Sequence, residues 1–313
     1  MEKVCVLCVT YNRKDYLLKM ISALEKQVYK IDSIIIVDNY SNDGTNEILK
    51  EKSYIIQEEY DKISLNIKNQ INFYYYRSSV NMGGAGGFKK CFEIANTLNV
   101  DYYWVMDDDV LPDENCLKNL IKYQTENNQI TIPNRNDENF KDRIVIDINM
   151  KSIFKGVKSR KEYYEFENNV TENINVVDMP FEGPLIRANL AKIIGLPNDK
   201  YFIYYDDTDY AWRAKKHTNI TYVKNAILHK QIIPTNSIRN QINWKEYYLL
   251  RNTIFFDRKY GENFGVRNLR PLLIWISLSI KNINNIKNLV KLNKAIWDGY
   301  FGKMGRTVEP GEF

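Results

Sequence analysis

The order of apolar runs and polar loops constrains the fold of this chain more than any other feature of its sequence. Short apolar runs with the length of buried strands occupy residues 3–10, 34–37, 73–76 and 102–106. A polar or glycine-rich loop and then a helical pattern follow each of the first three runs. Strands that alternate with helices in this way build a doubly wound sheet with helices on both faces. We therefore expect an α/β fold whose ligand-binding loops lie at the carboxyl ends of the strands.

The second half of the sequence predicts further elements after a long polar segment. Residues 127–175 are rich in Asn, Lys and Glu, and we expect an elaborated, partly mobile excursion with short strands at 130–132 and 144–148. Beyond it, the patterns predict a helix at 188–194, a helix that opens within 201–209, and two closing strands at 220–223 and 226–228.

From Trp244 onward the pattern is helical, aromatic and basic, with turns expected at Gly261 and near Pro271. We therefore predict an α/β domain over residues 1–235, with halves at 1–109 and 110–235. A helical extension over residues 236–313 is predicted to follow it.

The charge balance excludes some partners. The 44 Lys and Arg exceed the 39 Asp and Glu by five, which favours anionic partners weakly, and we expect no nucleic-acid partner because a dedicated binder carries a denser basic patch. No apolar stretch approaches the ~20 residues that a membrane-spanning helix needs, so only contact with a membrane surface stays open.

The four cysteines do not predict disulfide bonds. Cys5 and Cys8 form a CxxC pair, but they lie in a strand, where positions three apart face opposite ways. Redox chemistry of such a pair needs a helix N-terminus that lowers the thiol pKa. Together with Cys91 and Cys116 they are typical of a reducing cytoplasm.

Asp107, Asp108 and Asp109 directly follow the fourth strand. Their mutual repulsion is unfavourable unless a cation or hydrogen-bond donors offset it. On an extended backbone Asp107 and Asp109 project to one side and can hold Mg²⁺ or Mn²⁺, while Asp108 projects to the other side and is free for a ribose hydroxyl or a sugar. A solvated acidic turn is the alternative.

Residues 81–87 form a glycine-rich loop before a predicted helix. Backbone amides in such a loop can approach an anion closely, and the helix dipole favours negative charge there. The loop fits neither GxxxxGK[ST] nor GxGxxG, which argues against a P-loop ATPase and a dinucleotide oxidoreductase. Tight packing between helix and strand is the alternative explanation.

Two further groups of residues have both a structural and a chemical explanation. His229 ends an apolar run and could add a nitrogen ligand to the metal site, although a structural histidine is the plainer interpretation. Asp206, Asp207 and Asp209 precede a helix and can cap it, or one of them can deprotonate an acceptor hydroxyl beside the aromatic residues 201–205.

Taken together, four motifs resemble the family 2 inverting glycosyltransferases of the GT-A fold, over about residues 1–230. They are VTYNR at 9–13, VDN at 37–39 with Ser41 and DGT at 43–45, DDD at 107–109, and YDDTDY at 205–210 with Arg213. The stretch NMGGAGGF at 81–88 is similar to the NxGGAGGF motif of bacterial galactofuranosyltransferases. The resemblance implies a Rossmann-like mixed sheet with helices on both faces and transfer of a sugar, first of all galactofuranose from UDP-galactofuranose, onto a surface polysaccharide or glycolipid.

The resemblance also implies roles for individual residues. It assigns Asp207 as the catalytic base and Asp107, Asp109 and His229 as ligands of Mn²⁺ or Mg²⁺. The residues implied to bind the nucleotide sugar are Thr10, Tyr11, Asn12, Arg13, Asp38, Asn39, Asn81, Gly83, Gly84, Asp107 and Asp108. The residues implied to bind the acceptor are Glu182, Gly183, Tyr205, Asp206 and Trp212.

The chain departs from the galactofuranan polymerases of that family, since its catalytic motifs begin at residue 9 without a preceding β-sandwich and its helical tail is much smaller. A transferase that makes a single linkage is therefore expected. Segments at 247–252 and 297–303 resemble the tails of rhamnosyl- and galactofuranosyltransferases, which implies contact with a lipid-linked acceptor at the inner membrane face. Helix packing or a homo-oligomer contact is the alternative role of the tail.

Other functions stay open at this point. A rhamnosyltransferase or another hexosyltransferase is the nearest alternative. A sugar-nucleotide pyrophosphorylase would need a glycine-rich, arginine-bearing loop after the first strand, where this chain has Thr10 to Arg13. A non-catalytic sugar-nucleotide-binding scaffold in a polysaccharide assembly complex is the alternative from another class.

Overall fold

A mixed β-sheet forms the centre of the computed structural model, which describes residues 2–136, 140, 144–154, 162–163, 173–232, 242–309 and 311. Its parallel core runs through β4, β2, β1 and β5, in that spatial order. These strands confirm the four predicted runs, and their bounds are β1 Val4–Thr10, β2 Ser33–Asp38, β4 Ile71–Arg77 and β5 Tyr102–Asp107.

Antiparallel pairs extend this core on both sides, so the sheet is mixed. The full order is β10-β12-β7-β11-β5-β1-β2-β4-β3, and β6 pairs with β12. The added strands are β3 Ile63–Lys68, β6 Val110–Pro112, β7 Ile130–Asn134, β10 Asn173–Val176, β11 Leu185–Arg187 and β12 Ile220–Lys230. A separate pair consists of β8 Ile144–Val145 and β9 Glu162–Tyr163.

The structure corrects several of the predictions made for residues 127–235. The two closing strands are one strand, β12, because a bulge between Val223 and Ile227 absorbs the break in the apolar pattern without ending the pairing. Residues 130–134 of the expected excursion are β7, a member of the main sheet, and the strand at 144–148 ends at Val145. Much of the remaining excursion, and the domain boundary at 235/236, lie outside the described residues.

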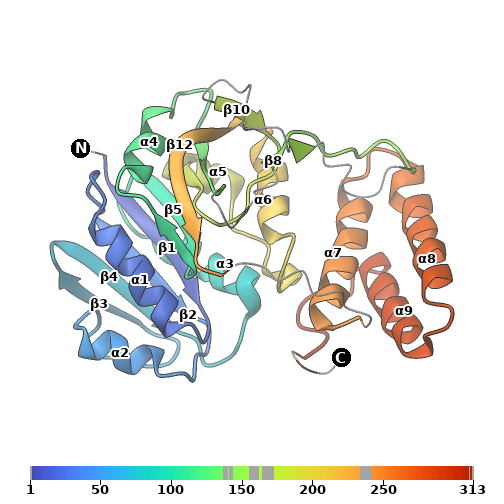
Figure 1. Cartoon of the computed structure of the whole chain (residues 1–313), viewed down its shortest axis with the longest axis horizontal. Helices are drawn as coiled ribbons and strands as arrows, with labels where there is room; N and C mark the ends of the chain where they lie inside the picture. Colours follow the sequence, from blue (N-terminus) through green and yellow to red (C-terminus); the bar gives the residue numbers. More distant parts are fainter. Residues whose placement is uncertain are drawn as a thin grey trace.

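Helices cover both faces of the sheet (Figure 1). The first face packs against α1 Lys14–Glu25, α2 Thr45–Glu51 and α4 Cys116–Lys122. The second face packs against α3 Gly83–Ala95, α5 Ala188–Ile194 and α6 Asp206–Ala214. Cys5 belongs to the second face and Cys8 to the first, which confirms that they point apart; both are buried free thiols.

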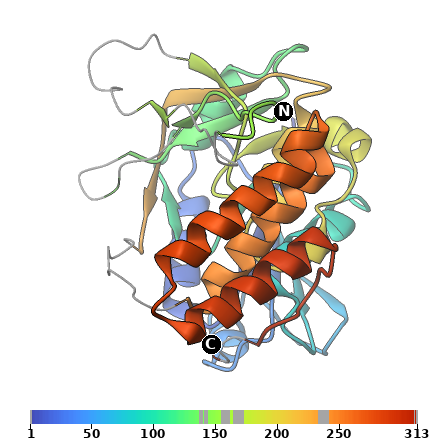
Figure 2. The ribbon, with the colours of Figure 1, turned by 90° about the vertical axis from the view of Figure 1, so that its right-hand side faces the viewer.

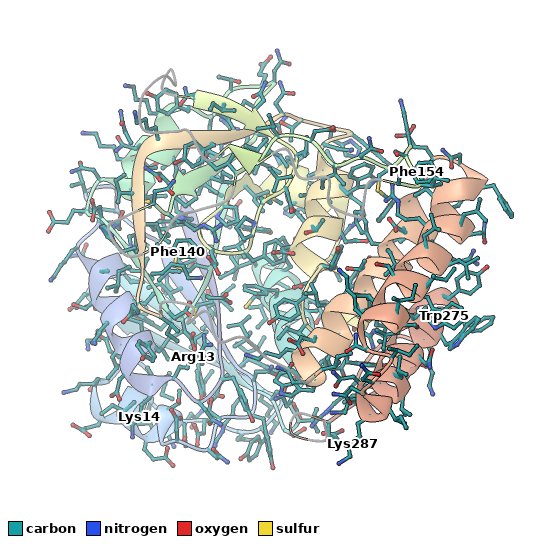
Figure 3. The ribbon with its side chains drawn as sticks, turned by 45° about the vertical axis from the view of Figure 1, so that its right-hand side comes forward. Arg13, Lys14, Phe140, Phe154, Trp275 and Lys287 are labelled. Carbon is teal, nitrogen blue, oxygen red and sulfur yellow. The ribbon has the colours of Figure 1, made fainter. Side chains whose placement is uncertain are left out.

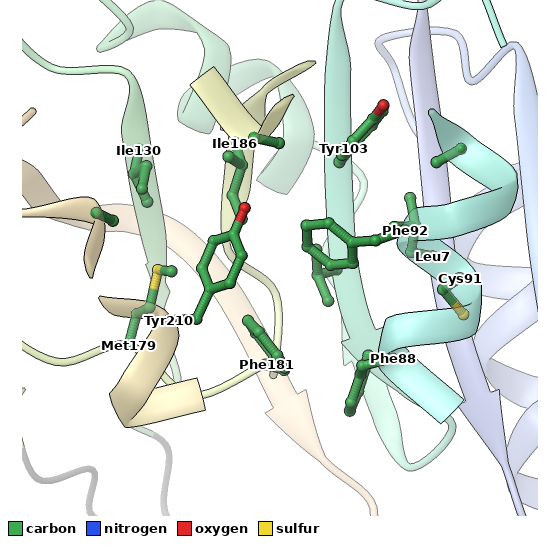
Figure 4. Packing of buried hydrophobic residues seen from close by; sticks show 14 of the residues in the cluster. Leu7, Phe88, Cys91, Phe92, Tyr103, Ile130, Met179, Phe181, Ile186 and Tyr210 are labelled. Carbon is green, nitrogen blue, oxygen red and sulfur yellow. The ribbon is translucent and has the colours of Figure 1, made fainter. Parts of the chain in front are cut away.

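Aromatic side chains fill the second face where α3 and α6 meet the sheet (Figure 4). Phe92 of α3 lies 5.3 Å from Tyr210 of α6 and 5.7 Å from Tyr103 of β5, measured between ring centroids. Phe88 packs on Phe181 at 4.8 Å. The contact between Phe92 and Tyr210 holds α6, whose first turn carries the predicted acidic site residues, against α3.

The tail is helical, as predicted, and its helices lie beside one another at the far side of the molecule from β3 (Figures 1 and 2). It comprises α7 Trp244–Tyr260, a π-helical turn η2 at Gly265–Leu269, α8 Arg270–Lys281 and α9 Ile286–Tyr300. The helix α7 ends at Gly261 as expected. The turn predicted near Pro271 is wrong, because Pro271 lies inside a helical run in which the π-helical turn η2 continues directly into α8.

A 3₁₀ turn, η1 Asp199–Tyr201, leads into the segment that precedes α6. Within the described part of the chain, no helix is both long enough and apolar enough to cross a membrane.

Candidate active site

A cavity of about 520 Å³ lies at the carboxyl ends of β1 and β5, where the doubly wound fold predicts a ligand. Residues from both halves of the α/β domain and from the start of α7 line it: Val9, Thr10, Tyr11, Arg13, Asn39, Asn81, Gly83, Gly84, Phe88, Asp107, Asp108, Asp109, Pro180, Phe181, Glu182, Phe202, Ile203, Tyr204, Asp206, Asp207, Trp244 and Lys245. The fold thus brings most of the predicted site residues together. Those that do not line the cavity are Asn12, Asp38, Gly183, Tyr205, Trp212 and His229.

The acidic triplet is held by the loop after β1. Asp108 accepts hydrogen bonds from Thr10 Oγ1 at 2.7 Å and Arg13 Nη1 at 3.0 Å, and the same Arg13 nitrogen lies 3.2 Å from Asp109 Oδ2. Burial raises the pKa of Asp108 to about 6, although Arg13 and Thr10 oppose this shift. Arg13 lies in the α/β part of the molecule, away from the tail helix that carries Trp275 (Figure 3).

Strand alternation does not extend through the triplet. The strand β5 ends at Asp107, so Asp108 and Asp109 lie in the following turn, and Arg13 bridges them. In this structure both oxygens of Asp108 accept a hydrogen bond, one from Thr10 and one from Arg13. Its role toward a ribose hydroxyl or a sugar stays a prediction.

The cluster holds more negative charge than its neighbours neutralise. Burial raises the pKa of Asp107 well above its ordinary value, and Glu182, Asp109 and Asp108 raise it further, with Lys230 opposing them. Asp109 Oδ1 is buried and has no hydrogen-bond partner among the described residues. An orphaned carboxylate oxygen in a buried acidic cluster fits a divalent cation, so these residues suit the metal that the sequence predicts.

Glu182 lies between two cations that the sequence patterns missed. Lys230 Nζ is 2.6 Å from Glu182 Oε1, and Arg135 pairs with the other carboxylate oxygen. Burial opposes ionisation of Glu182, but Arg135 and Lys230 outweigh burial and lower its pKa. Lys230 directly follows His229 at the end of β12. This position at a strand end was the only feature of the sequence that indicated Lys230 as a site residue.

His229, the third predicted metal ligand, lies beside Asp113. Its side chain is 43% exposed, and Nε2 lies 3.2 Å from Asp113 Oδ1. Among the described residues, no three His, Cys, Asp or Glu side chains are arranged so that they could hold a metal ion. The ligand set of Asp107, Asp109 and His229 therefore stays a prediction.

The glycine-rich motif starts a helix, where the sequence predicted a loop up to residue 87. The helix α3 begins at Gly83, and Asn81 Oδ1 accepts from the Gly83 amide at 2.9 Å. Gly83 and Gly84 line the cavity, while a Cβ on Gly87 would come within 2.6 Å of a Val9 methyl. The motif therefore combines a cavity wall with the tight helix-strand packing that was the alternative.

Asp38 and Asn12 organise loops rather than line the cavity. Asp38 is fully buried, and it accepts from the Ser41 amide and the Tyr75 hydroxyl, each at 2.7 Å. Asn12 joins the loops after β1 and β2, because its backbone amide donates to Ser41 Oγ and its side-chain Oδ1 accepts from the Asn42 backbone amide. Their role toward a nucleotide remains a prediction.

The acids at the start of α6 have different environments. Asp209 is fully buried and paired with Arg213 at 3.0 Å and Lys259 at 2.7 Å, so it is a structural residue. Asp206 and Asp207 line the cavity. Burial, and then the charge of Asp207, raises the pKa of Asp206 to about 8.

Tyr205 and Trp212, which the resemblance assigns to the acceptor, pack instead against the tail. Both rings contact Phe256 of α7, with centroids 5.4 and 5.8 Å away. The positions of the tail helices, which sequence patterns do not give, account for this difference. The Gly183 amide donates to the Val105 carbonyl and the Gly183 carbonyl accepts from Trp104 Nε1, so Gly183 continues the pairing of the β11 segment with β5.

The fold of this chain is of the GT-A type, and the cavity lies at the carboxyl ends of its strands. Staphylococcus aureus TarS solved with UDP-GlcNAc is similar at a TM-score of 0.53 and 11% identity, over 96% of this chain and 82% of that chain. The mannosyltransferase PcManGT of Pyrobaculum calidifontis, solved with GDP-Man and Mn²⁺, has a TM-score of 0.56 at 11% identity, over 96% and 87% of the two chains. At these identities the likeness shows the fold alone.

The family model described as glycosyl transferase family 2 matches residues 5–193, and the chain belongs to this family. Galactofuranosyltransferase GlfT1 of Mycolicibacterium smegmatis is 23% identical over 213 residues, covering 66% of this chain and 64% of that protein. GlfT1 of Mycobacterium tuberculosis is 27% identical over 214 residues, covering 66% and 63%. The chain therefore spans just under two thirds of the length of these relatives.

Proposed function

We propose that the chain transfers galactofuranose from UDP-galactofuranose to a hydroxyl of a surface polysaccharide or glycolipid, with inversion at the transferred carbon. The observation that carries this proposal is the single cavity in which the Asp107 to Asp109 triplet and the Asp206–Asp207 pair meet. Its volume of about 520 Å³ matches that of a small-ligand site.

The choice of galactofuranose rests on the similarity to GlfT1 and on the NMGGAGGF motif at 81–88, whose Gly83 and Gly84 line the cavity. The chain is also 33% identical over 104 residues to abequosyltransferase RfbV of Salmonella typhimurium. This similarity favours, as the second candidate, a nucleotide-sugar donor that carries a sugar other than galactofuranose. Pocket contacts decide between such donors, and short motifs do not fix them.

In the proposed reaction Asp207 accepts the proton of the acceptor hydroxyl while the hydroxyl oxygen attacks the sugar in line with the departing nucleoside diphosphate. The neighbouring Asp206 keeps its proton at neutral pH, because its pKa is about 8, so it is the poorer base of the two. Arg13 holds the acidic triplet in place from the loop after β1.

Asp107 and Asp109, with His229 as the third predicted ligand, would hold Mn²⁺ or Mg²⁺. A cation bound there would neutralise charge on the departing diphosphate. The unpartnered oxygen Asp109 Oδ1 supports this assignment.

The tail is proposed to contact the inner face of an anionic membrane, where a lipid-linked acceptor would be presented. Large apolar side chains with 64–76% of their surface exposed occur on and between α8 and α9: Ile280, Ile283, Ile286 and Val290. Residues 264–303 also contain seven Lys or Arg and one acid, Asp298, which pairs with Lys294. Exposed apolar residues flanked by basic ones suit an interfacial helix pair, whereas two like-charged tails would repel in a homo-oligomer.

A panel of nucleotide sugars tests the donor. We expect transfer from UDP-galactofuranose in the presence of Mn²⁺ and its loss in excess EDTA. Donor binding without transfer or hydrolysis, under any acceptor tried, would indicate the non-catalytic scaffold instead.

Sedimentation with vesicles tests the membrane contact. We expect binding to phosphatidylglycerol-containing vesicles, and weaker binding by Ile283→Glu. The control Ile67→Glu changes an equally exposed isoleucine on β3, 66% against 68%, and should bind as the parent does. A tail variant that binds vesicles normally but no longer self-associates would identify a homo-oligomer contact.

A further inference from the structure

The backbone that leads into the acidic pair of α6 is strained. Phe202, Tyr204 and Tyr205 have φ values of 65°, 65° and 73°, although none of them is glycine. A side chain with a Cβ rarely adopts this left-handed region, so other contacts must hold the segment in place. Asp206 follows Tyr205 directly, and Phe202, Ile203 and Tyr204 line the cavity.

One buried side-chain amide of the tail contacts three carbonyls of this segment. Asn252 of α7 is fully buried, and its Nδ2 lies 3.1 Å from the Tyr201 carbonyl, 2.8 Å from that of Ile203 and 2.9 Å from that of Tyr204. These three carbonyls belong to one strained turn, so a single side chain ties three of its peptide groups to α7.

The neighbours of Asn252 on α7 act on the same segment. Arg251 Nη2 donates to the Tyr201 carbonyl at 2.9 Å, and Thr253 Oγ1 donates to the Tyr205 hydroxyl at 2.9 Å. Three consecutive residues of the tail therefore bind residues 201–205.

The other side of the segment is fixed by the glycine-rich helix. The Ala85 amide donates to the Phe202 carbonyl at 3.1 Å, and Gly83 lies directly against the same carbonyl. Residues 201–205 are thus clamped between α3 and α7, and the clamp ends where the acidic pair begins.

We infer that Asn252 is a positioning residue that sets the place of Asp207 in the cavity, so that the tail is part of the catalytic machinery. This inference rests on the proposed function, because it concerns the base of that reaction. Without the amide, the Ile203 and Tyr204 carbonyls lose the Asn252 donor, while the Tyr201 carbonyl keeps Arg251 Nη2. The turn can then relax toward ordinary φ values, which moves the start of α6.

Asn252→Ala tests this role by transfer kinetics in the full chain. We expect kcat to fall at least about tenfold, while the KM for donor and the affinity for UDP stay within about twofold, because Arg13 and Asn81 lie on the other wall. Amide hydrogen exchange over residues 202–208 should become faster.

The matched control is Asn288→Ala. Asn288 is a second buried asparagine of the tail, and it forms hydrogen bonds with Asn282 and Ile242, which belong to the tail as well. It should lower the melting temperature and leave kcat within about twofold of the parent value.

Thr253→Val serves if Asn252→Ala does not fold, because it removes only the bond to Tyr205, and we expect a smaller fall in kcat with unchanged UDP affinity. An unchanged kcat in a folded Asn252→Ala variant would overturn the inference. If that variant does not fold, an unchanged kcat in Thr253→Val would overturn it instead. An equal loss of kcat in Asn288→Ala would overturn it as well. A parent protein that transfers no sugar at all would contradict the proposed function. Amide hydrogen exchange over residues 202–208 in Asn252→Ala would then test, without any activity, whether Asn252 holds this segment in place.

Discussion

Gly83 and Phe202 lie in backbone contact, although 119 positions separate them in the chain. A Cβ built on Gly83 would come within 2.1 Å of the Phe202 carbonyl oxygen, and Gly83 has a φ of 72°. The first residue of α3 and the turn before α6 therefore have no room for a side chain between them. This contact joins the predicted nucleotide-binding wall of the cavity to the wall that carries Asp207.

Gly83→Ala is expected to destabilise the protein by more than about 2 kcal/mol, because it adds both a left-handed strain and a steric overlap with backbone. Gly84→Ala is the matched control, since a Cβ there meets nothing within 4 Å. It should leave the free energy of unfolding equal to the parent's or raise it by up to about 1 kcal/mol. Urea unfolding of both variants measures the difference, and equal stabilities would contradict the close approach.

Asp38→Ala is expected to weaken UDP binding and to lower the free energy of unfolding by about 1–3 kcal/mol, because it leaves the Tyr75 hydroxyl and the Ser41 amide without their acceptor. Calorimetry with UDP and urea unfolding measure the two effects. Tyr75→Phe removes one of the two bonds and keeps the carboxylate, so it should cost about 1 kcal/mol and leave UDP affinity unchanged. An Asp38→Ala variant that binds UDP as tightly as the parent would limit Asp38 to a structural role.

The sequence predicted the strands of the parallel core because each is a short apolar run that stops at a polar loop. It also predicted which loops meet, since parallel strands place their carboxyl ends at one edge. This reasoning placed Arg13 and Asp107 at that edge, whereas the choice of Asp207 came from the family resemblance. The strand β3 was missed although its apolar residues, such as Ile63 and Ile67, alternate with polar ones as in a strand, because they are exposed at the sheet edge and form no continuous apolar run.

Contacts between distant segments were beyond the sequence patterns. Nothing in residues 244–260 indicates that Asn252 reaches the turn at 201–205, or that Phe256 covers Trp212, since helical periodicity gives a buried face without its partner. The partners of His229 and Glu182 were missed for the same reason, because Asp113 and Arg135 lie in loops whose course depends on tertiary packing.

Asp109→Ala is expected to raise the Mn²⁺ concentration needed for half-maximal transfer by at least about tenfold, because it removes a buried carboxylate oxygen that has no partner among the described residues. His229→Ala should raise it as well if His229 is the third ligand. Asp113→Asn is the control, since it changes only the described partner of His229. Activity of His229→Ala with an unaltered Mn²⁺ requirement would exclude His229 as a ligand, and full activity of the parent in excess EDTA would exclude the metal.

Asp206 should make stability depend on pH. Its pKa is raised to about 8 in the folded chain by burial and then by Asp207, so the folded state keeps a proton that the unfolded state releases above its ordinary pKa of 3.8. Stability from this group is therefore full at low pH and is lost as the pH rises toward about 8. Asp206→Asn cannot ionise and should flatten this slope in urea unfolding followed from about pH 5 to about pH 8. Asp107, Asp108 and Asp257, whose pKa values burial also raises, leave a residual slope. An unchanged slope in Asp206→Asn would show that Asp206 titrates normally.

Asp207→Asn is expected to reduce turnover by ~10² to 10⁴, because it removes the proposed general base while keeping the size of the side chain. Donor and metal affinity should survive, since Asp107 and Arg13 are untouched. Asp209→Asn is the control that separates chemistry from folding, because Asp209 is fully buried against Arg213, Lys259 and two tyrosine hydroxyls. It should lower the melting temperature strongly and change the turnover of the folded fraction little. If Asp207→Asn kept near-parent turnover while Asp206→Asn lost it with an unchanged melting temperature, Asp206 would be the base, and its proton would have to leave before each transfer.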